Sequence, residues 1–223
     1  MDSSMYESYS SVVQTRTIRI LETIAMKENL KFVTGDISNA FLHADTNEKI
    51  YTVAGPEFND KEGSVVIIKK ALYGLATSAR RWNITLGDAI KDMGFKPTRA
   101  DPDLWIKASK NGKKYEYLAT YVDDIIIVAE DRMKYLETLK NKFSIRNIEE
   151  MPEYYLGSNL EIRKNNTIKI SSRKYISEII NKYENKYGTI KKESVPATPG
   201  YHPELDDSPL LNEDETSHYQ SYI

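Results

Sequence analysis

Residues 117–128 read YLATYVDDIIIV, in which two apolar runs flank a pair of adjacent aspartates. The runs are short and rich in β-branched and aromatic residues, a composition typical of strands, and the very short connection between them predicts a hairpin. Asp123 and Asp124 fall at the turn of this hairpin. Because both strands are apolar, we expect them to be buried inside a packed domain.

Two adjacent carboxylates at such a turn repel each other. At about 4 Å and an effective dielectric constant near 20, like unit charges repel by roughly 4 kcal/mol, so the pair requires water or a cation. A plain exposed turn is one explanation, but the favoured two-residue hairpin turns use glycine or asparagine, and residues 121–124 contain neither. A divalent-ion site explains the pair better, since Mg²⁺ prefers oxygen ligands and takes one or two carboxylates from a protein.

Asp36 is a candidate for a third carboxylate, because it ends an apolar stretch at residues 30–37 and precedes small residues. Taken alone, an aspartate at a strand end is more often a cap or turn residue. Because it precedes an Asp-Asp hairpin in the chain, Asp36 is nevertheless a candidate ligand: a third carboxylate would let two ions share one site.

Hydrophobic periodicity predicts alternating helices and short strands along the chain. Helices are expected at 15–28, 78–93, 133–143 and 174–187, and strands at 30–37, 50–53, 65–68, 104–106, 115–121, 125–129 and 168–170. The strands at 50–53 and 65–68 are separated by turn residues and suit a hairpin. This order, without a glycine-rich phosphate loop, predicts an α+β fold with helices on one face of a largely antiparallel sheet.

Composition is that of an ordinary globular protein, with 40% hydrophobic and 29% charged residues among 223. There is no cysteine, and the start of the chain lacks the basic and apolar blocks of a secretory signal. We therefore expect a soluble, intracellular protein without a thiolate metal site or a membrane segment. The formal charge of −2 conceals a gradient, because lysines and arginines cluster between residues 107 and 192, whereas the residues after Glu193 include acidic side chains but no lysine or arginine. The basic clusters are either solvated surface or local phosphate-binding sites.

Several motifs occur together in one order. DISNAFL at 36–42, ALYGL at 71–75, SARRW at 78–82 and YVDD at 121–124 resemble successive motifs of the reverse transcriptase of copia-type retrotransposons. Flanking segments agree in order and approximate spacing, namely YSSVV at 9–13, GF at 94–95 followed by DP at 101–102, YLG at 155–157 and YI at 175–176. The likeness runs from about Tyr6 to Pro199 and is far more specific than any single motif.

The resemblance implies the palm of a right-hand polymerase, with partial fingers and the start of a thumb. Residues 1–157 would form the palm with partial fingers, and 158–192 a connection next to the thumb. Residues 193–223, rich in proline and acidic side chains, would form an irregular linker toward an RNase H domain.

The resemblance also implies RNA-directed DNA polymerase activity. Asp36 and Asp123 would bind two Mg²⁺ ions, with Mn²⁺ as a substitute, and Asp124 would complete the acidic cluster. One ion would activate the primer 3′-hydroxyl, and the other would neutralise the triphosphate and the departing pyrophosphate.

Further roles follow from the same likeness. Phe41 would be a steric gate against ribonucleotides, although a core phenylalanine is the alternative. The remaining residues at the nucleotide would be Tyr73, Gly74, Ser78 and Arg80, with Arg81 as a second choice for the phosphate contact, whereas Trp82 suits core packing better than base stacking. Contacts to primer and template would come from Tyr121, Tyr155, Leu156, Gly157 and Lys164.

The implied partners are an RNA or DNA template with its primer, deoxynucleoside triphosphates, and the RNase H and integrase domains of one polyprotein. The implied location is the cytoplasm, inside a virus-like particle. Two departures stand out: ATSAR at 76–80 replaces the family's usual KQSPR, and the basic fingers segment before Tyr6 is missing. The alternatives are therefore an inactive, nucleic-acid-binding relic of a reverse transcriptase, or a two-metal phosphodiesterase.

Overall fold

The computed structural model describes residues 10–192, 194, 200, 202–205 and 207–221. The chain forms two compact units, of which the first comprises Met1–Glu153 with Leu160–Ile170, and the second Tyr154–Asn159 with Ser171–Ile223. Within the described ranges, every helix is too short or too polar to cross a bilayer.

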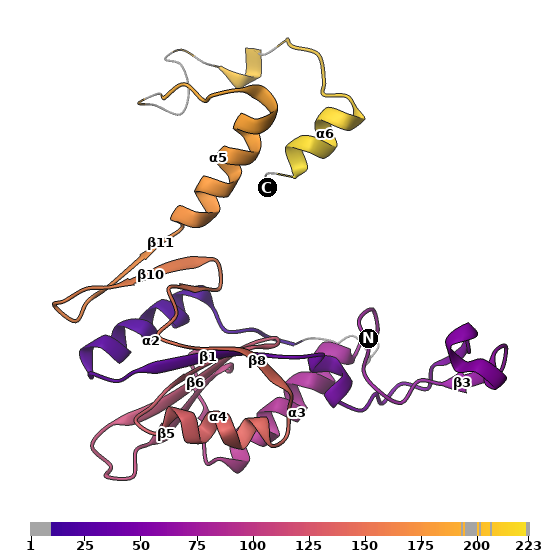
Figure 1. The fold of residues 1–223 in the computed structure, drawn as a ribbon, viewed down its shortest axis with the longest axis vertical. Helices are drawn as coiled ribbons and strands as arrows, with labels where there is room; N and C mark the ends of the chain where they lie inside the picture. The colour runs from indigo at the N-terminus through magenta and orange to yellow at the C-terminus, as the bar shows by residue number, and fades with distance from the viewer. Residues whose placement is uncertain (1–9, 193, 195–199, 201, 206, 222–223) are drawn as a thin grey trace. The chain divides into compact units, whose positions relative to one another are not determined.

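Six antiparallel strands form the main sheet of the first unit (Figure 1). Their order is β4-β5-β6-β7-β1-β8, so β1 lies between β7 and β8, which are both distant from it in sequence. The antiparallel α+β fold expected from the sequence is thereby confirmed. The strands are β1 (Phe32–Ile37), β4 (Lys96–Pro97), β5 (Leu104–Ala108), β6 (Tyr115–Tyr121), β7 (Asp124–Val128) and β8 (Ile145–Glu150).

Three helices pack on this sheet, and their bounds lie within three residues of the predicted ones. They are α2 (Thr15–Lys27), α3 (Ser78–Asp92) and α4 (Arg132–Lys140). The expectation that helices cover one face is wrong, because α3 and α4 lie on one face and α2 on the other (Figure 1). The physical reason is the apolar sequence of the central strands, since residues 125–128 are buried at every position and both faces of β7 therefore need a cover.

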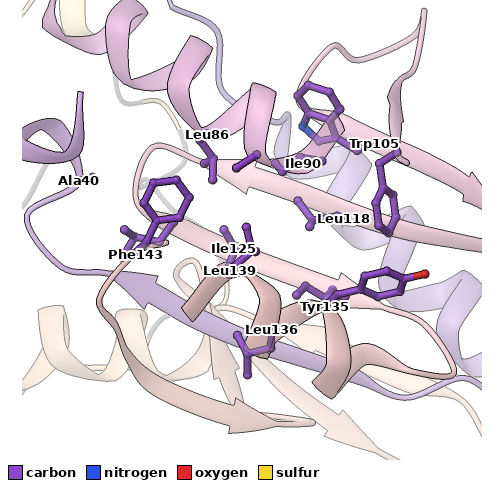
Figure 2. Packing of buried hydrophobic residues seen from close by; sticks show 14 of the residues in the cluster. Ala40, Leu86, Ile90, Trp105, Leu118, Ile125, Tyr135, Leu136, Leu139 and Phe143 are labelled. Carbon is purple, nitrogen blue, oxygen red and sulfur yellow. The ribbon is translucent and has the colours of Figure 1, made fainter. Parts of the chain in front are cut away.

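The larger core lies between the sheet and the α3–α4 face, as Figure 2 shows. Apolar residues four apart on α3 put Trp82, Leu86 and Ile90 on one stripe of that helix, which is the helical period. The strands contribute Val33, Ile37, Trp105, Leu118, Ile125 and Ile127 to the same cluster, and α4 contributes Tyr135, Leu136 and Leu139.

The start of α2 is capped from a distance. Gln14 occupies the cap position without a side-chain hydrogen bond to the helix. Instead, Asp101 Oδ2 accepts hydrogen bonds from the Gln14 amide at 3.0 Å and from Thr17 Oγ1 at 2.7 Å. A carboxylate is favourable at the positive end of a helix dipole, so Asp101 fastens α2 to the segment before β5.

The remaining strands and 3₁₀ turns are short, whereas α5 (Arg173–Tyr187) is a long helix. The predicted hairpin at 50–68 is present as β2 (Tyr51–Val53) and β3 (Val65–Ile67), joined through the 3₁₀ turn η2 (Pro56–Lys61). The other elements are η1 (Ala40–His43), β9 (Tyr154–Tyr155), β10 (Ser158–Ile162), β11 (Ile168–Ser171), η3 (Pro203–Leu205) and α6 (Glu213–Gln220).

An irregular linker was expected at 193–223, and within it Glu213–Gln220 instead forms the helix α6. The helix begins with a capping box, in which the Asn212 side chain accepts from the Glu215 amide and the Glu215 carboxylate accepts from the Asn212 amide. The three acidic residues of its first turn suit the positive helix end. Residues 193, 195–199, 201, 206 and 222–223 of the predicted linker lie outside the described residues.

Gly35 provides a test of how closely β1 packs on β8. A Cβ at this position would lie 2.8 Å from Ile145 Cγ2, a methyl on a stiff β-branched side chain. We expect Gly35→Ala to lower the free energy of unfolding by about 1–3 kcal/mol. In an Ile145→Ala background the further loss should be smaller, because the clashing atom is gone. Urea denaturation of the four proteins measures this, and equal losses in both backgrounds would contradict the contact.

Glu22 makes the stability of the first unit depend on pH. This α2 residue is only 1% exposed, and burial raises the pKa of its carboxyl from 4.5 to about 7, against an opposing effect of Arg19. Because the folded-state pKa is above the unfolded value, the contribution of Glu22 to the free energy of unfolding is greatest below about pH 4.5. This contribution is lost as the pH rises through 7.

Glu22→Gln, which stays neutral, should therefore be more stable than the parent chain at pH 8 by about 2 kcal/mol. At pH 4.5 the two proteins should unfold at similar urea concentrations. Urea titrations at both pH values measure the difference, and a stability gain that is the same at both would argue against a buried, neutral Glu22.

Candidate active site

The three predicted carboxylates lie at one end of the central strands. Asp36, at the end of β1, is directly opposite Asp124, at the start of β7, in the antiparallel register. Residues in such a pair have Cβ atoms about 5 Å apart and point to the same face. Asp123 lies in the adjoining turn, so the structure brings together all three residues that the sequence pointed to.

The β6–β7 turn is tight and strained. Tyr121 pairs with Asp124, which leaves Val122 and Asp123 as the two turn residues. Val122 has a φ of 56°, in the left-handed region that a β-branched residue rarely adopts. Two hydrogen bonds hold the turn: the Ile37 amide donates to the Asp123 carbonyl at 2.8 Å, and Trp82 Nε1 donates to the Val122 carbonyl at 2.7 Å.

The Asp124 carboxyl is affected both by burial and by the neighbouring carboxylates. Burial, followed by the charges of Asp123 and Asp36, raises the pKa of Asp124 from 3.8 to about 6. Proximity of like charges disfavours ionisation, as at other clustered carboxylates. The cluster thus concentrates negative charge at the turn.

One cation already lies at this site. Arg146 of β8 is opposite Asp36 in the register, and its Nε donates to Asp36 Oδ1 at 2.6 Å. The Asp36 side chain is 20% exposed, whereas that of Arg146 is 63% exposed, so the guanidinium covers the carboxylate from the solvent side.

The donor set fits a divalent cation in its chemistry, since three clustered carboxylates offer the hard oxygen ligands that Mg²⁺ and Mn²⁺ take. In the part of the chain that the structure describes, however, no group of three or more acidic or histidine side chains is drawn close enough to enclose an ion. The Asp36 carboxylate is paired instead with the Arg146 guanidinium. Asp36, Asp123 and Asp124 are the residues that would hold the ion.

Two predicted nucleotide-binding residues contact each other. Phe41, on η1 directly after β1, packs on Tyr73 with ring centroids 4.4 Å apart. Phe41 is 8% exposed, and Tyr73 is 71% exposed. Phe41 thus belongs to the core, as the alternative had it, and at the same time supports an exposed aromatic ring.

The loop that carries Tyr73 depends on its neighbours. Gly74 has a φ of 96°, a conformation that suits glycine. Ser78 is buried, and its hydroxyl accepts a hydrogen bond from the Leu72 amide at 3.0 Å, so it holds the start of the loop in place. Arg81 Nε donates to the Asp45 carbonyl at 2.9 Å, whereas Arg80 is exposed in the first turn of α3. Arg80 is therefore the better placed of the two for a phosphate.

The predicted primer and template contacts are dispersed. Tyr121, 38% exposed, adjoins the carboxylates at the end of β6. Leu156 and Gly157, both with positive φ, form the two-residue turn after Tyr155 in the second unit. Lys164 is not brought to the carboxylates. It lies in the β10–β11 loop, in which Asn166 donates a hydrogen bond to the Met26 carbonyl near the C-terminal end of α2. That end of α2 leads into the start of β1, whereas Asp36 is near the opposite end of the strand.

Two features of the site were missed from the sequence. Arg146 belongs to an unpredicted strand and meets Asp36 across 110 positions of sequence. Trp82 was correctly assigned to the core, at 2% exposed, but its hydrogen bond to the Val122 carbonyl of the β6–β7 turn was not foreseen.

Fold and site together define an antiparallel α+β domain with a carboxylate cluster at a β-hairpin turn. The family model described as reverse transcriptase (RNA-dependent DNA polymerase) matches residues 2–195. The chain therefore belongs to the reverse transcriptase family.

Its relatives are retrotransposon polyproteins. The Retrovirus-related Pol polyprotein from transposon RE1 of Arabidopsis thaliana is 32% identical over 180 residues, 78% of this chain and 12% of that protein. The corresponding polyprotein from transposon TNT 1-94 of Nicotiana tabacum is 27% identical over 81% of the chain, and the Transposon Ty1-DR1 Gag-Pol polyprotein of Saccharomyces cerevisiae 28% over 94%. The matched region covers only 12–14% of these relatives.

The hydrogen bond from Trp82 to the turn can be tested with a matched control. Trp82→Phe keeps most of the ring but removes the donor to Val122, and should lower the free energy of unfolding by about 1–2 kcal/mol beyond the loss of packing. Trp105 is also buried, and its Nε1 meets no acceptor among the described residues, so Trp105→Phe loses indole packing without losing a hydrogen bond. Chemical denaturation compares the two variants, and equal losses would exclude a role for the Val122 contact.

Proposed function

We propose that this chain is the catalytic part of an RNA-directed DNA polymerase that copies a retroelement template by metal-dependent nucleotidyl transfer. The observation that supports this most is the register that sets Asp36 opposite Asp124 with Asp123 in the adjoining turn. Family membership supports the same activity.

In this proposal Asp36, Asp123 and Asp124 hold two Mg²⁺ ions, for which Mn²⁺ can substitute. Bound divalent ions lower the pKa of an attacking hydroxyl and neutralise developing phosphate charge. The chain's own residues bind and orient. Burial and the charges of Asp123 and Asp36 raise the pKa of Asp124, so a bound cation would relieve the repulsion among the carboxylates that the register brings together.

The nucleotide is proposed to lie against the Phe41–Tyr73 pair. Phe41 is held rigidly by the core, so it can act as a steric gate toward a ribose 2′-hydroxyl. Gly74 and Ser78 keep the loop in shape, and Arg80 offers an exposed guanidinium to phosphate. Tyr121, Tyr155, Leu156, Gly157 and Lys164 remain the proposed contacts to primer and template.

The proposed organisation is a palm with partial fingers at 1–157, a connection at 158–192 and a linker at 193–223. The proposed partners are a primed RNA or DNA template, deoxynucleoside triphosphates, and RNase H and integrase domains of one polyprotein. A cytoplasmic virus-like particle is the proposed location.

Primer extension tests the proposal. The chain should extend a DNA primer on an RNA template only when Mg²⁺ or Mn²⁺ is present. Asp123→Asn, which keeps the size but loses the charge, should reduce extension by at least about 100-fold, because the site then lacks a ligand to the ion. Fluorescence anisotropy of a labelled primer–template should change little in this variant.

Asp131→Asn is the matched control. Asp131 is an exposed aspartate beyond the other end of β7 and pairs with Lys110, so its replacement should leave extension unchanged. Absence of extension by the unsubstituted chain would overturn the proposed activity. If primer–template binding persisted in that case, the result would identify a nucleic-acid-binding relic.

A further inference from the structure

Strand β8 carries an extra residue where it pairs with the middle of β1. Thr34 is opposite Glu149 and Asp36 is opposite Arg146, with a change of register between the two pairs. Thr34 and Asp36 point to the same face, because strand side chains alternate. Glu149 and Arg146 are three positions apart and would point to opposite faces in an unbroken strand. A bulge with Asn147 at φ 50° removes this mismatch.

The bulge therefore directs a cation at Asp36. In an unbroken strand with the register of Glu149, the neutral Asn147 would face Asp36 instead. With the bulge, Arg146 donates from Nε to Asp36 Oδ1 at 2.6 Å. The hydrogen bond and charge of Asp36, with a smaller contribution from the charge of Asp123, hold the pKa of Arg146 above its ordinary value. These are two of the three carboxylates proposed to hold ions.

The Arg146–Asp36 pair differs from an ordinary surface salt bridge in the burial of its carboxylate. Lys110 pairs with Asp131 at 2.9 Å, and the Asp131 side chain is 50% exposed. The Asp36 side chain is only 20% exposed and lies beside two further carboxylates. Water screens Asp131 without help from a partner, whereas Asp36 has little water and like-charged neighbours, so its counter-cation matters more.

We propose that Arg146 is a positioning residue that serves as the resident counter-cation of the carboxylate cluster. It holds the Asp36 carboxylate in place while no ion is bound, and a divalent ion displaces it from that carboxylate. The inference rests on the ion-binding role proposed above for Asp36. It requires that the guanidinium and the divalent ion compete for one carboxylate.

Competition can be measured without any polymerase assay. Binding of Mn²⁺ to the full chain is followed by the loss of the electron paramagnetic resonance signal of free Mn²⁺. Arg146→Met, which keeps the length of the side chain but not its charge, should bind Mn²⁺ about fivefold more tightly. Arg146→Lys should stay close to the parent chain, because it restores a cation.

Lys110→Met is the matched control, because it also removes one positive charge and one ion pair, at the far end of β6. Its Mn²⁺ affinity should equal that of the parent chain. Thermal unfolding in EDTA gives a second readout: Arg146→Met should lower Tm, and in an Asp36→Asn background it should have no effect, since the partner charge is gone.

The inference is overturned if Arg146→Met and Lys110→Met bind Mn²⁺ alike, or if neither the parent chain nor Arg146→Met binds it. Failure of the proposed function gives a different result. Tighter Mn²⁺ binding by Arg146→Met without primer extension supports the counter-cation and refutes the polymerase. Metal-dependent extension with unchanged Mn²⁺ affinity supports the polymerase and refutes the counter-cation.

Discussion

The antiparallel pairing of β1 with β7 is the interaction on which the site depends. It joins segments far apart in the chain, and its register sets Asp36 opposite Asp124. A slip by one residue would turn the apolar side chains of β1 away from the core and Asp36 to the other face. Burial of Val33 and Ile37 against α3 and α4 therefore fixes the register, so hydrophobic packing determines where the carboxylates meet.

Clustered carboxylates and a strained turn both oppose folding, and neighbouring contacts offset them. The left-handed Val122 is restrained by the Trp82 indole, and the turn carbonyl of Asp123 by the Ile37 amide. Trp82 is packed in the main core, so its hydrogen bond ties the strained turn to that core. Electrostatic repulsion is met by Arg146 and by the raised pKa of Asp124.

Periodicity was enough to predict the elements that bury one clear face. The hairpin at 117–128 and the helices α2 and α3 follow from apolar spacing, and the motif order identified Asp36 as the partner of the hairpin. Strand β8 escaped prediction because IRNIEE, at residues 145–150, lies at a sheet edge, is largely exposed and contains a bulge, so it shows no alternation. For α6 a signal was available, since Asn212 and Glu215 have the spacing of a capping box, but the prolines and acidic residues around it favoured a linker.

The position of Arg146 on an exposed edge strand suits a cation that a divalent ion displaces. A guanidinium that is 63% exposed and held through one Nε contact gains little from its partner, because water screens the pair. A divalent ion carries twice the charge and can contact several carboxylate oxygens at once, so it outcompetes such a pair. A buried arginine in a bidentate pair would instead be costly to remove, because the carboxylate or the guanidinium would be left without a partner. The bulge in β8 thus brings Arg146 close to Asp36 while leaving the guanidinium exposed, so that little free energy is lost when a divalent ion replaces it.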